Sequence, residues 1–260
     1  MCTIIDIGSN SIRSMQVDHQ GVFHGKRLVT TRLATGLDKT GRLAPACIEA
    51  SVKAIADFVK AARDAGGEAY AYATSAVRDA DNREEFLQAV RDACGVSVDV
   101  LTGEEEARYA LLGAGAQGLV DIGGGSAQIV TDGFAQSWPI GCVRAAELQT
   151  RDAIEARCKS LFRFPRLLVP RWAGAGGTLT TLAALQLGLD AYDADKVGNA
   201  SLTLSDIEAL IDRLIAMGDA RAAHPLLTKR HDVIIPGAIV ACFILRGMGI
   251  PRLFITDADG

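Results

Sequence analysis

Short apolar runs alternate with longer segments of helical periodicity along this chain, and the alternation predicts strands separated by helices. Residues 3–7 and 14–18 are apolar-rich and are joined by Gly8-Ser9-Asn10-Ser11, which predicts a β-hairpin with a polar tip. Between Pro45 and Ala62 the apolar side chains recur at helical spacing, and Gly66-Gly67 is a typical stop signal. Strands interleaved with helices favour an α/β fold over a sandwich or a bundle.

Four more elements are expected in the first half of the chain. Asn82 and Glu85 have the spacing of a capping pair at the start of a helix that runs to Gly95. The other three are strands at 69–73 and 96–101 and a helix at 104–112.

The opening pattern then occurs a second time. Residues 119–126 form an apolar run that leads into Asp-Ile-Gly and a small polar turn, and residues 128–132 form a returning run that ends in Asp, in the same order as at the N-terminus. Such self-similarity indicates two related halves. We place the boundary near residue 116, which gives an N-terminal lobe at 1–116 and a C-terminal lobe at 117–260.

The second lobe continues the alternation of strands and helices. Ser205-Asp206-Ile207-Glu208 matches a capping box at the start of an amphipathic helix. Further helices are expected at 144–159, directly after Gly174-Ala175-Gly176-Gly177-Thr178, and at 236–246, with strands at 166–169 and 252–256.

The net charge argues against a nucleic-acid partner. The 260 residues carry 27 Lys and Arg against 31 Asp and Glu, a formal charge of -4, whereas nucleic-acid-binding domains are usually basic. A polyanionic ligand would therefore be bound by a local cluster of groups. The segment from Arg13 to Arg42 is locally basic, and it could steer a polyanion or form a solvated rim.

A cytoplasmic location without membrane contact is expected. The N-terminal segment has an acid at position 6, with no basic leader or long apolar run behind it, which is unlike a secretion signal. No uncharged run reaches the roughly 18–20 residues that span a bilayer. The six cysteines have no two-residue gap of the kind that zinc and redox sites favour, which fits a reducing compartment. Cys142 has no histidine nearby in the sequence to activate it, so we interpret it as a packed residue and not as a nucleophile.

The two Asp-Ile-Gly turns are the first candidates for chemistry. An acid at the end of a strand can hold a divalent cation while the bare amides of a glycine-rich turn approach phosphate oxygens. Mg²⁺ needs only one or two protein carboxylates beside phosphate and water oxygens, so Asp6 and Asp121 would suffice. Either turn alone could equally be a tight hairpin, but two matched copies favour a phosphate site.

Three other segments could take part. The residues 174–178 precede a helix and could bind an anion there, or serve only tight packing. Glu104 and Glu105 suit the first turn of a helix, whereas Glu106 could orient and deprotonate a water near a bound phosphate. Arg78 could grip phosphate through its planar fork or be an ordinary surface arginine.

Taken in order, these motifs resemble those of the exopolyphosphatase and guanosine pentaphosphate phosphatase family in its short form, within the actin, sugar kinase and Hsp70 superfamily. The segments that carry the resemblance are 5–11, 73–80, 103–108, 121–126, 140–144, 176–178 and 230–237.

The resemblance implies two ribonuclease-H-like lobes with a cleft between them, and release of a terminal phosphate by a water that attacks in line. It implies that Glu106 is the general base, that Asp6 and Asp121 are associated with Mg²⁺, and that Arg78 binds phosphate. In-line phosphoryl transfer depends mainly on such positioning and charge neutralisation. The implied phosphate loops consist of Gly8, Ser9, Asn10 and Ser11 in the first lobe and of Gly123, Gly124, Gly125 and Ser126 in the second.

Two positions depart from the family pattern. Gln128 stands where relatives usually have Glu, which removes a carboxylate beside the metal, and Ala127 replaces the usual Thr, which removes a hydroxyl beside the loop. Weaker metal binding, an altered substrate and loss of catalysis are the open consequences.

The function implied by the resemblance is Mg²⁺-dependent release of terminal phosphate from inorganic polyphosphate or guanosine pentaphosphate. One alternative is a protein that binds either ligand without catalysis. The other is a phosphotransferase or ATPase of the same superfamily, although no sugar-binding signature is evident. A homodimer is an option in each case.

Overall fold

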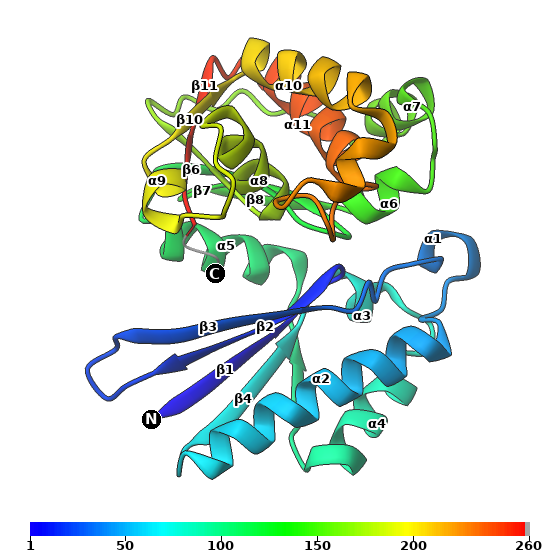
Figure 1. The fold of residues 1–260 in the computed structure, drawn as a ribbon, viewed down its shortest axis with the longest axis vertical. Coiled ribbons are helices and arrows are strands. Elements are labelled where there is room, and N and C mark those ends of the chain that lie inside the picture. Colours follow the sequence, from blue (N-terminus) through cyan, green and yellow to red (C-terminus); the bar gives the residue numbers. More distant parts are fainter. Residues whose placement is uncertain (258–260) are drawn as a thin grey trace. The chain divides into compact units, whose positions relative to one another are not determined.

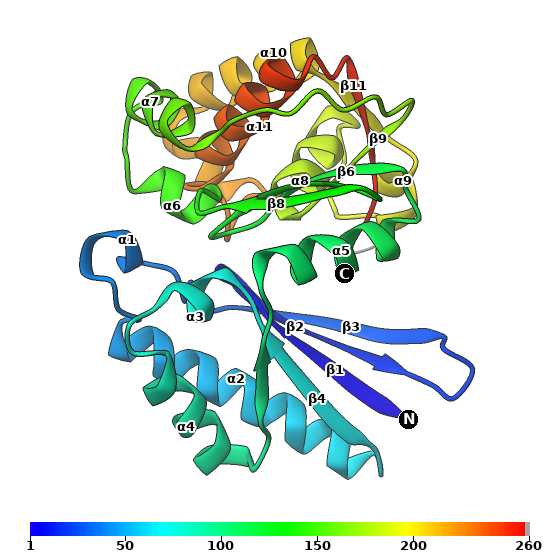
Figure 2. The ribbon, with the colours of Figure 1, turned by 180° about the vertical axis from the view of Figure 1, so that it is seen from behind.

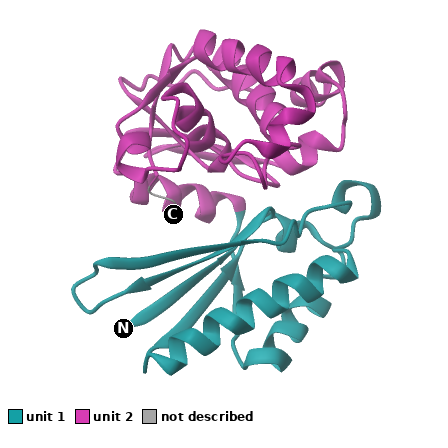
Figure 3. Cartoon of the chain, viewed as in Figure 1, with its two compact units in different colours: residues 1–102 teal, residues 103–260 magenta. Residues whose placement is uncertain are grey.

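The chain divides into two compact units. The structure, a computed structural model, describes residues 1–257, and the division falls between Thr102 and Gly103 (Figure 3). It lies earlier than the boundary that we placed near residue 116. Helix α5 (Gly103–Ala114) belongs to the second unit because it packs against that unit's strands, β6 (Gly118–Ile122), β7 (Ala127–Thr131) and β8 (Phe134–Trp138).

The first unit is built on a five-stranded mixed sheet (Figure 1). The predicted hairpin is formed by its first two strands, which pair antiparallel, and the third strand continues the meander. The fourth and fifth strands run parallel to the first. In the order β3-β2-β1-β4-β5, the strands are β3 (Phe23–Thr30), β2 (Ser11–Val17), β1 (Cys2–Ile7), β4 (Glu68–Ala73) and β5 (Val98–Val100).

Two long helices cover this sheet. Helix α2 (Pro45–Asp64) packs against β1, β2 and β4 and buries Ile55, Phe58 and Val59. Helix α4 (Arg83–Cys94) lies beside α2 (Figure 2). Both helices were expected from their apolar periodicity. The short helices α1 (Leu37–Thr40) and α3 (Ser75–Asp79) were not.

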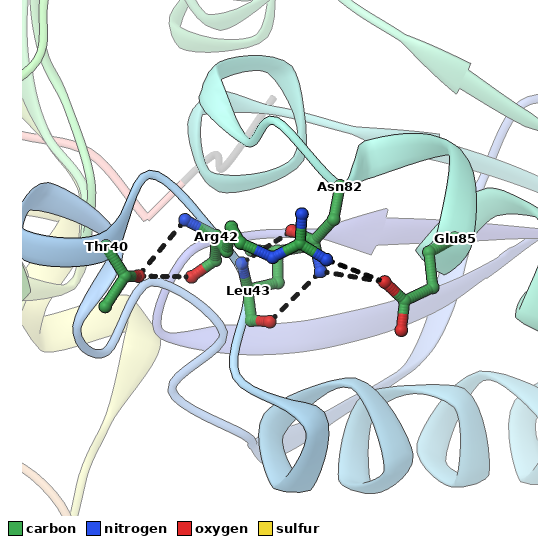
Figure 4. A network of polar contacts seen from close by, with 5 residues as sticks. All are labelled: Thr40, Arg42, Leu43, Asn82 and Glu85. Carbon is green, nitrogen blue, oxygen red and sulfur yellow. Dashed lines mark hydrogen bonds and ion pairs between the residues drawn. The ribbon is translucent and has the colours of Figure 1, made fainter.

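The expected capping interaction of α4 is wrong. Asn82 is the N-cap residue but makes no side-chain cap bond. Its Oδ1 instead accepts from the Leu43 amide at 2.8 Å, and its Nδ2 donates to the Leu43 carbonyl at 3.2 Å and to Glu85 Oε2 at 3.3 Å (Figure 4). The side-chain amide of Asn82 therefore bonds to Leu43, 39 residues away in the chain, and not to the first turn of the helix, as the local spacing predicted.

The second unit repeats the strand order of the first. Strands β6, β7 and β8 form an antiparallel meander, β9 (Trp172–Ala175) runs parallel to β6, and β11 (Arg252–Ile255) runs parallel to β9. Strand β10 (Ser201–Thr203) adds an antiparallel edge, giving β10-β11-β9-β6-β7-β8. The shared order is that of ribonuclease-H-like folds, so the predicted pair of related α/β lobes is confirmed.

The helices of the second unit cover both faces of its sheet. Helix α5 packs with Leu119 and Val130 on one face, whereas Val120 and Ile129 face a larger core that includes buried residues of α8 and α11. None of the helices within residues 1–257 combines the length and the apolar character needed to cross a bilayer. Besides α5, the helices are α6 (Cys142–Ala146), α7 (Arg151–Leu161), α8 (Gly177–Gln186), α9 (Ala194–Gly198), α10 (Leu204–Ala216), the 3₁₀ helix η1 (Gly218–Ala223) and α11 (Ile234–Met248).

Three expectations for this unit need correction. The helix expected at 144–159 is broken into α6 and α7, and Gln149 adopts a positive φ of 65° at the break. No strand forms at 166–169, because Pro165 and Pro170 bracket the segment and cannot donate to a ladder. The capping box of α10 uses Thr203 and Asp206 and not Ser205.

Candidate functional site

The first glycine-containing turn is tight and internally bonded. The Gly8 amide donates to the Ser11 carbonyl at 3.2 Å, and a Cβ on Gly8 would lie 2.9 Å from that oxygen. The Ser9 carbonyl accepts from the Ala34 amide, and the Asn10 carbonyl accepts from the amides of residues 31 and 32. None of these bonds uses the amide of Ser9 or Asn10, so these amides are the groups that the turn can offer to an anion.

The polar side chains of this turn serve its architecture. Ser9, Asn10 and Ser11 are all buried, with 4–6% of their surface exposed. Ser9 Oγ accepts from the Ala76 amide at 3.1 Å, which ties the turn to α3, and Asn10 Nδ2 donates to Ser11 Oγ at 3.1 Å. We therefore assign any phosphate contact of this turn to its backbone more than to its hydroxyl groups.

Asp6 lies on β1 directly opposite Arg13 on β2. Its Oδ2 is 3.7 Å from Arg13 Nη1, and both side chains are about a fifth exposed, at 21% and 23%. The carboxylate is thus accessible and already has one cationic neighbour, which would compete with a metal ion for it.

Arg78 fixes the end of β5. Its Nη1 donates to the Leu101 carbonyl at 2.8 Å, and its Nε lies 3.6 Å from Asp79 Oδ1. Leu101 comes just before α5, so Arg78 holds the chain near the start of the helix that carries Glu106.

The second glycine-rich turn is fastened to the start of α6. The Gly123 amide donates to the Ser126 carbonyl at 3.0 Å, which closes the turn. The carbonyls of Gly123 and Gly124 accept from the amides of Cys142 and Val143, each at 2.9 Å. A Cβ on Gly141 would lie 2.5 Å from the Gly123 oxygen and from the Gly124 carbonyl group. Only glycine allows this approach of two backbone segments.

Asp121 lies at a meeting point of three strands and a third glycine segment. It is opposite Gln128 on β7 and Ala175 on β9. A Cβ on Gly176, whose φ is 88°, would collide with Asp121 Oδ1. The backbone that leads into α8 therefore approaches the carboxylate closely.

Arg230 reaches the same segment from a distant part of the chain. Its guanidinium group lies where a Cβ on Gly177 would be, at the first residue of α8. The sequence indicated the glycine segment and the 230–237 motif separately, and nothing in their spacing showed that they touch. Two adjacent glycines before a helix were the only local signal for this approach.

Cys142 is a packed residue, as expected. Its surface is 2% exposed, and burial raises the pKa of its thiol, an effect that the Arg230 charge partly offsets. Gly237 packs against its Cβ. A buried thiol with a raised pKa is a poor nucleophile.

The three acids at the start of α5 differ in burial. Glu104 and Glu105 are exposed, whereas Glu106 is half-buried and precedes Ala107, which is fully buried against the sheet. Glu106 therefore lies at the border of the packed face of the helix, unlike its two neighbours. This difference fits the distinction that we drew between them, and the catalytic role of Glu106 stays a prediction.

The basic segment from Arg13 to Arg42 is largely paired inside its own unit. Arg42 Nη2 lies 3.4 Å from Glu85 Oε2 (Figure 4), and the guanidinium carbon of Arg27 lies 4.9 Å from the centre of the Phe58 ring. With the Arg13–Asp6 pair, these contacts favour the interpretation of this segment as a rim over that of a polyanion track.

The donor set suits Mg²⁺. Among residues 1–257 no cluster of three or more His, Cys, Asp or Glu side chains forms a metal cage. Mg²⁺ does not require one, because it takes one or two carboxylates and completes its shell with phosphate and water oxygens. Asp6 in the first unit and Asp121 in the second each lie at the end of a strand beside a glycine-containing turn, so each turn by itself offers a hard oxygen ligand of the kind that Mg²⁺ takes.

The chain is similar to proteins of known family along nearly its whole length. The profile of the Ppx/GppA phosphatase family matches residues 15–258. Exopolyphosphatase 2 of Mycobacterium tuberculosis (strain CDC 1551 / Oshkosh) is 33% identical over an alignment 300 positions long, which covers 98% of this chain and 94% of that protein. The crystal structure of the Aquifex aeolicus member of the Ppx/GppA family has a TM-score of 0.75 at 30% identity and covers 98% and 93% of the two chains. The crystal structure of an exopolyphosphatase-like protein has a TM-score of 0.87 at 29% identity, covering 98% and 94%.

Proposed function

The chain belongs to the Ppx/GppA phosphatase family, and from that premise we propose that it is a Mg²⁺-dependent phosphohydrolase that releases terminal phosphate from inorganic polyphosphate. The observation that carries the proposal is the surrounding of Asp121. Gly176 approaches this carboxylate directly, and the Arg230 guanidinium group approaches the next residue, Gly177. The closed glycine turn at 123–126 follows Asp121 in the chain. Backbone amides and a cation beside a carboxylate suit a phosphate with its metal ion.

Each residue of the proposed site has a distinct task. Asp6 and Asp121 would hold Mg²⁺, which would supply charge neutralisation on the phosphate oxygens. The amides of the turns at 8–11 and 123–126 donate hydrogen bonds to phosphate oxygens, and Arg78 adds a cationic donor. Glu106 accepts a proton from a water whose oxygen bonds to the terminal phosphorus, while the anhydride bond on the opposite side breaks and the shortened chain leaves as a phosphate anion.

Guanosine pentaphosphate belongs to the same proposal as a second substrate. Its terminal phosphate is joined by a phosphoric anhydride bond, as in polyphosphate, so the same groups would serve both. The Mycobacterium tuberculosis relative described above is named an exopolyphosphatase. For this reason we propose polyphosphate as the first substrate.

Phosphate release from triphosphate, long polyphosphate and guanosine pentaphosphate, measured side by side with and without Mg²⁺, tests the proposal. We expect release from polyphosphate that stops when Mg²⁺ is removed by a chelator. Tight binding of these ligands without hydrolysis would favour a non-catalytic binding protein. Phosphate transfer that requires an added acceptor would favour a phosphotransferase.

A further inference from the structure

Gln128 is a buried residue that follows the second glycine-rich turn, residues 123–126. It lies on β7 opposite Asp121, and only 1% of its surface is exposed. Its Nε2 donates to Ser126 Oγ at 3.0 Å. Its Oε1 is also buried and has no hydrogen-bond partner among the described residues.

The direction of this hydrogen bond determines what Ser126 can do. An amide nitrogen can only donate, so the Ser126 oxygen accepts and the hydroxyl hydrogen must point elsewhere. Ser126 is 3% exposed and lies in the turn that Gly123 closes. A buried hydroxyl donor without an acceptor is costly, and a phosphate oxygen held by the same turn would satisfy it.

We propose that Gln128 is a positioning residue that keeps Ser126 as a hydrogen-bond donor to a phosphate oxygen of the ligand. This inference rests on the proposed function, because it assumes that the 123–126 turn binds phosphate. A carboxylate at position 128 would reverse the polarity. It would accept the Ser126 hydrogen, and the hydroxyl would present only lone pairs to an anion.

A double-mutant cycle on phosphate affinity tests the inference. Binding of inorganic phosphate in the presence of Mg²⁺ is measured by calorimetry for the wild type, Ser126→Ala, Gln128→Glu and the double variant. Ser126→Ala should weaken phosphate binding roughly 10- to 100-fold, the loss of one hydrogen bond to a charged group. Gln128→Glu removes the donation from Ser126, but it also adds a negative charge and restores a carboxylate beside the metal, so the informative quantity is its effect compared between the two backgrounds at position 126.

The comparison between backgrounds isolates the hydrogen bond. The added charge acts whether or not residue 126 has a hydroxyl, so the factor by which Gln128→Glu weakens binding should be about 10- to 100-fold larger with Ser126 than with Ser126→Ala. Equal factors in both backgrounds would overturn the inference.

Gln128→Met covers the case in which the buried glutamate prevents folding. Methionine has nearly the shape of glutamine without its donor, so Ser126→Ala should cost less phosphate affinity in this background than in the wild type. An unchanged cost would contradict the inference. Gln136→Met on β8 is the matched control, since Gln136 is half-buried on the neighbouring strand, and it should bind phosphate like the wild type.

The experiments distinguish failure of the proposed hydrolase function from failure of the proposed role of Gln128. If the wild type binds phosphate and the cycle shows the expected coupling, but no polyphosphate is hydrolysed, the proposed function is wrong and the role of Gln128 stands. If polyphosphate is hydrolysed and the cycle shows no coupling, only the role of Gln128 is wrong.

Discussion

Burial distinguishes residues of the same type in this chain. Glu106 differs from Glu104 and Glu105 by its half-buried position, which sequence spacing allowed but did not require. Arg230 was not assigned to the site from sequence, because its neighbour Gly177 is far away along the chain. Residue types with a local pattern could be predicted, whereas contacts made by a long side chain across the fold could not.

The cysteines provide a test at this scale. Cys142, Cys158 and Cys242 are buried, and burial raises the pKa of Cys158 to about 12 and that of Cys242 to about 11. Iodoacetamide should therefore label Cys94 in the native protein well before these three, because alkylation requires an accessible thiolate. Mass spectrometry of peptides after timed labelling measures the order. Labelling in denaturant, where all six should react, is the control, and early native labelling of Cys142 would contradict its packed position.

At the scale of elements, periodicity was sufficient where one face of a segment packs on a sheet. The helices α2, α4, α5, α10 and α11 follow from their apolar spacing. The break between α6 and α7 occurs at a residue with a left-handed backbone conformation. The strand expected at 166–169 is absent because prolines flank the segment. A count of apolar positions includes neither of these features. The N-cap of α10 is Thr203, two residues before the expected serine, because the helix already begins at Leu204.

The contact between the second turn and α6 predicts a strict requirement for glycine. Gly141→Ala should lower both phosphate release and the free energy of unfolding, the latter by about 1–3 kcal/mol, because the new Cβ would push against backbone atoms of the turn. Gly133→Ala is the matched control, since no atom lies within 4 Å of its Cβ position. Thermal unfolding and phosphate release of both variants check this. Wild-type behaviour of Gly141→Ala would mean that the turn is not held as described.

The α10 capping box should make part of the stability depend on pH. Hydrogen bonds from the Thr203 hydroxyl and amide lower the pKa of Asp206. A carboxyl whose folded pKa is below its unfolded value, about 3.9, stabilises the fold above that value and loses this effect as the pH falls through the folded pKa. Asp206→Asn should therefore lower the free energy of unfolding by about 1 kcal/mol near neutral pH and by less in acid.

Urea unfolding at neutral and acidic pH measures this difference. Asp212→Asn, an exposed change in the same helix, is the control and should have little effect at either pH. A cost of Asp206→Asn that is the same at both pH values would show that the carboxylate charge does not contribute to the cap.

For the whole molecule, the repeat in the sequence was the most informative feature. Two copies of the Asp-Ile-Gly turn predicted two related lobes, and both sheets have the same central strand order. The position of the division could not be predicted from the glycines near residue 116, because the apolar face of α5 (Gly103–Ala114), which precedes them, decides to which unit this helix belongs. The net charge of -4 is consistent with recognition of phosphate by amides, a metal ion and single arginines, and not by a general positive field.

Glu106 is the proposed base in the hydrolysis of polyphosphate by this chain. The most direct measurement is the rate of phosphate release from long polyphosphate, with Mg²⁺, by the wild type and by Glu106→Gln, together with the thermal unfolding of both. We predict release by the wild type, a loss of roughly 100-fold or more in Glu106→Gln, and unchanged unfolding. Release by Glu106→Gln at the wild-type rate would contradict the assignment of the base, and no release by the wild type would contradict the proposed function.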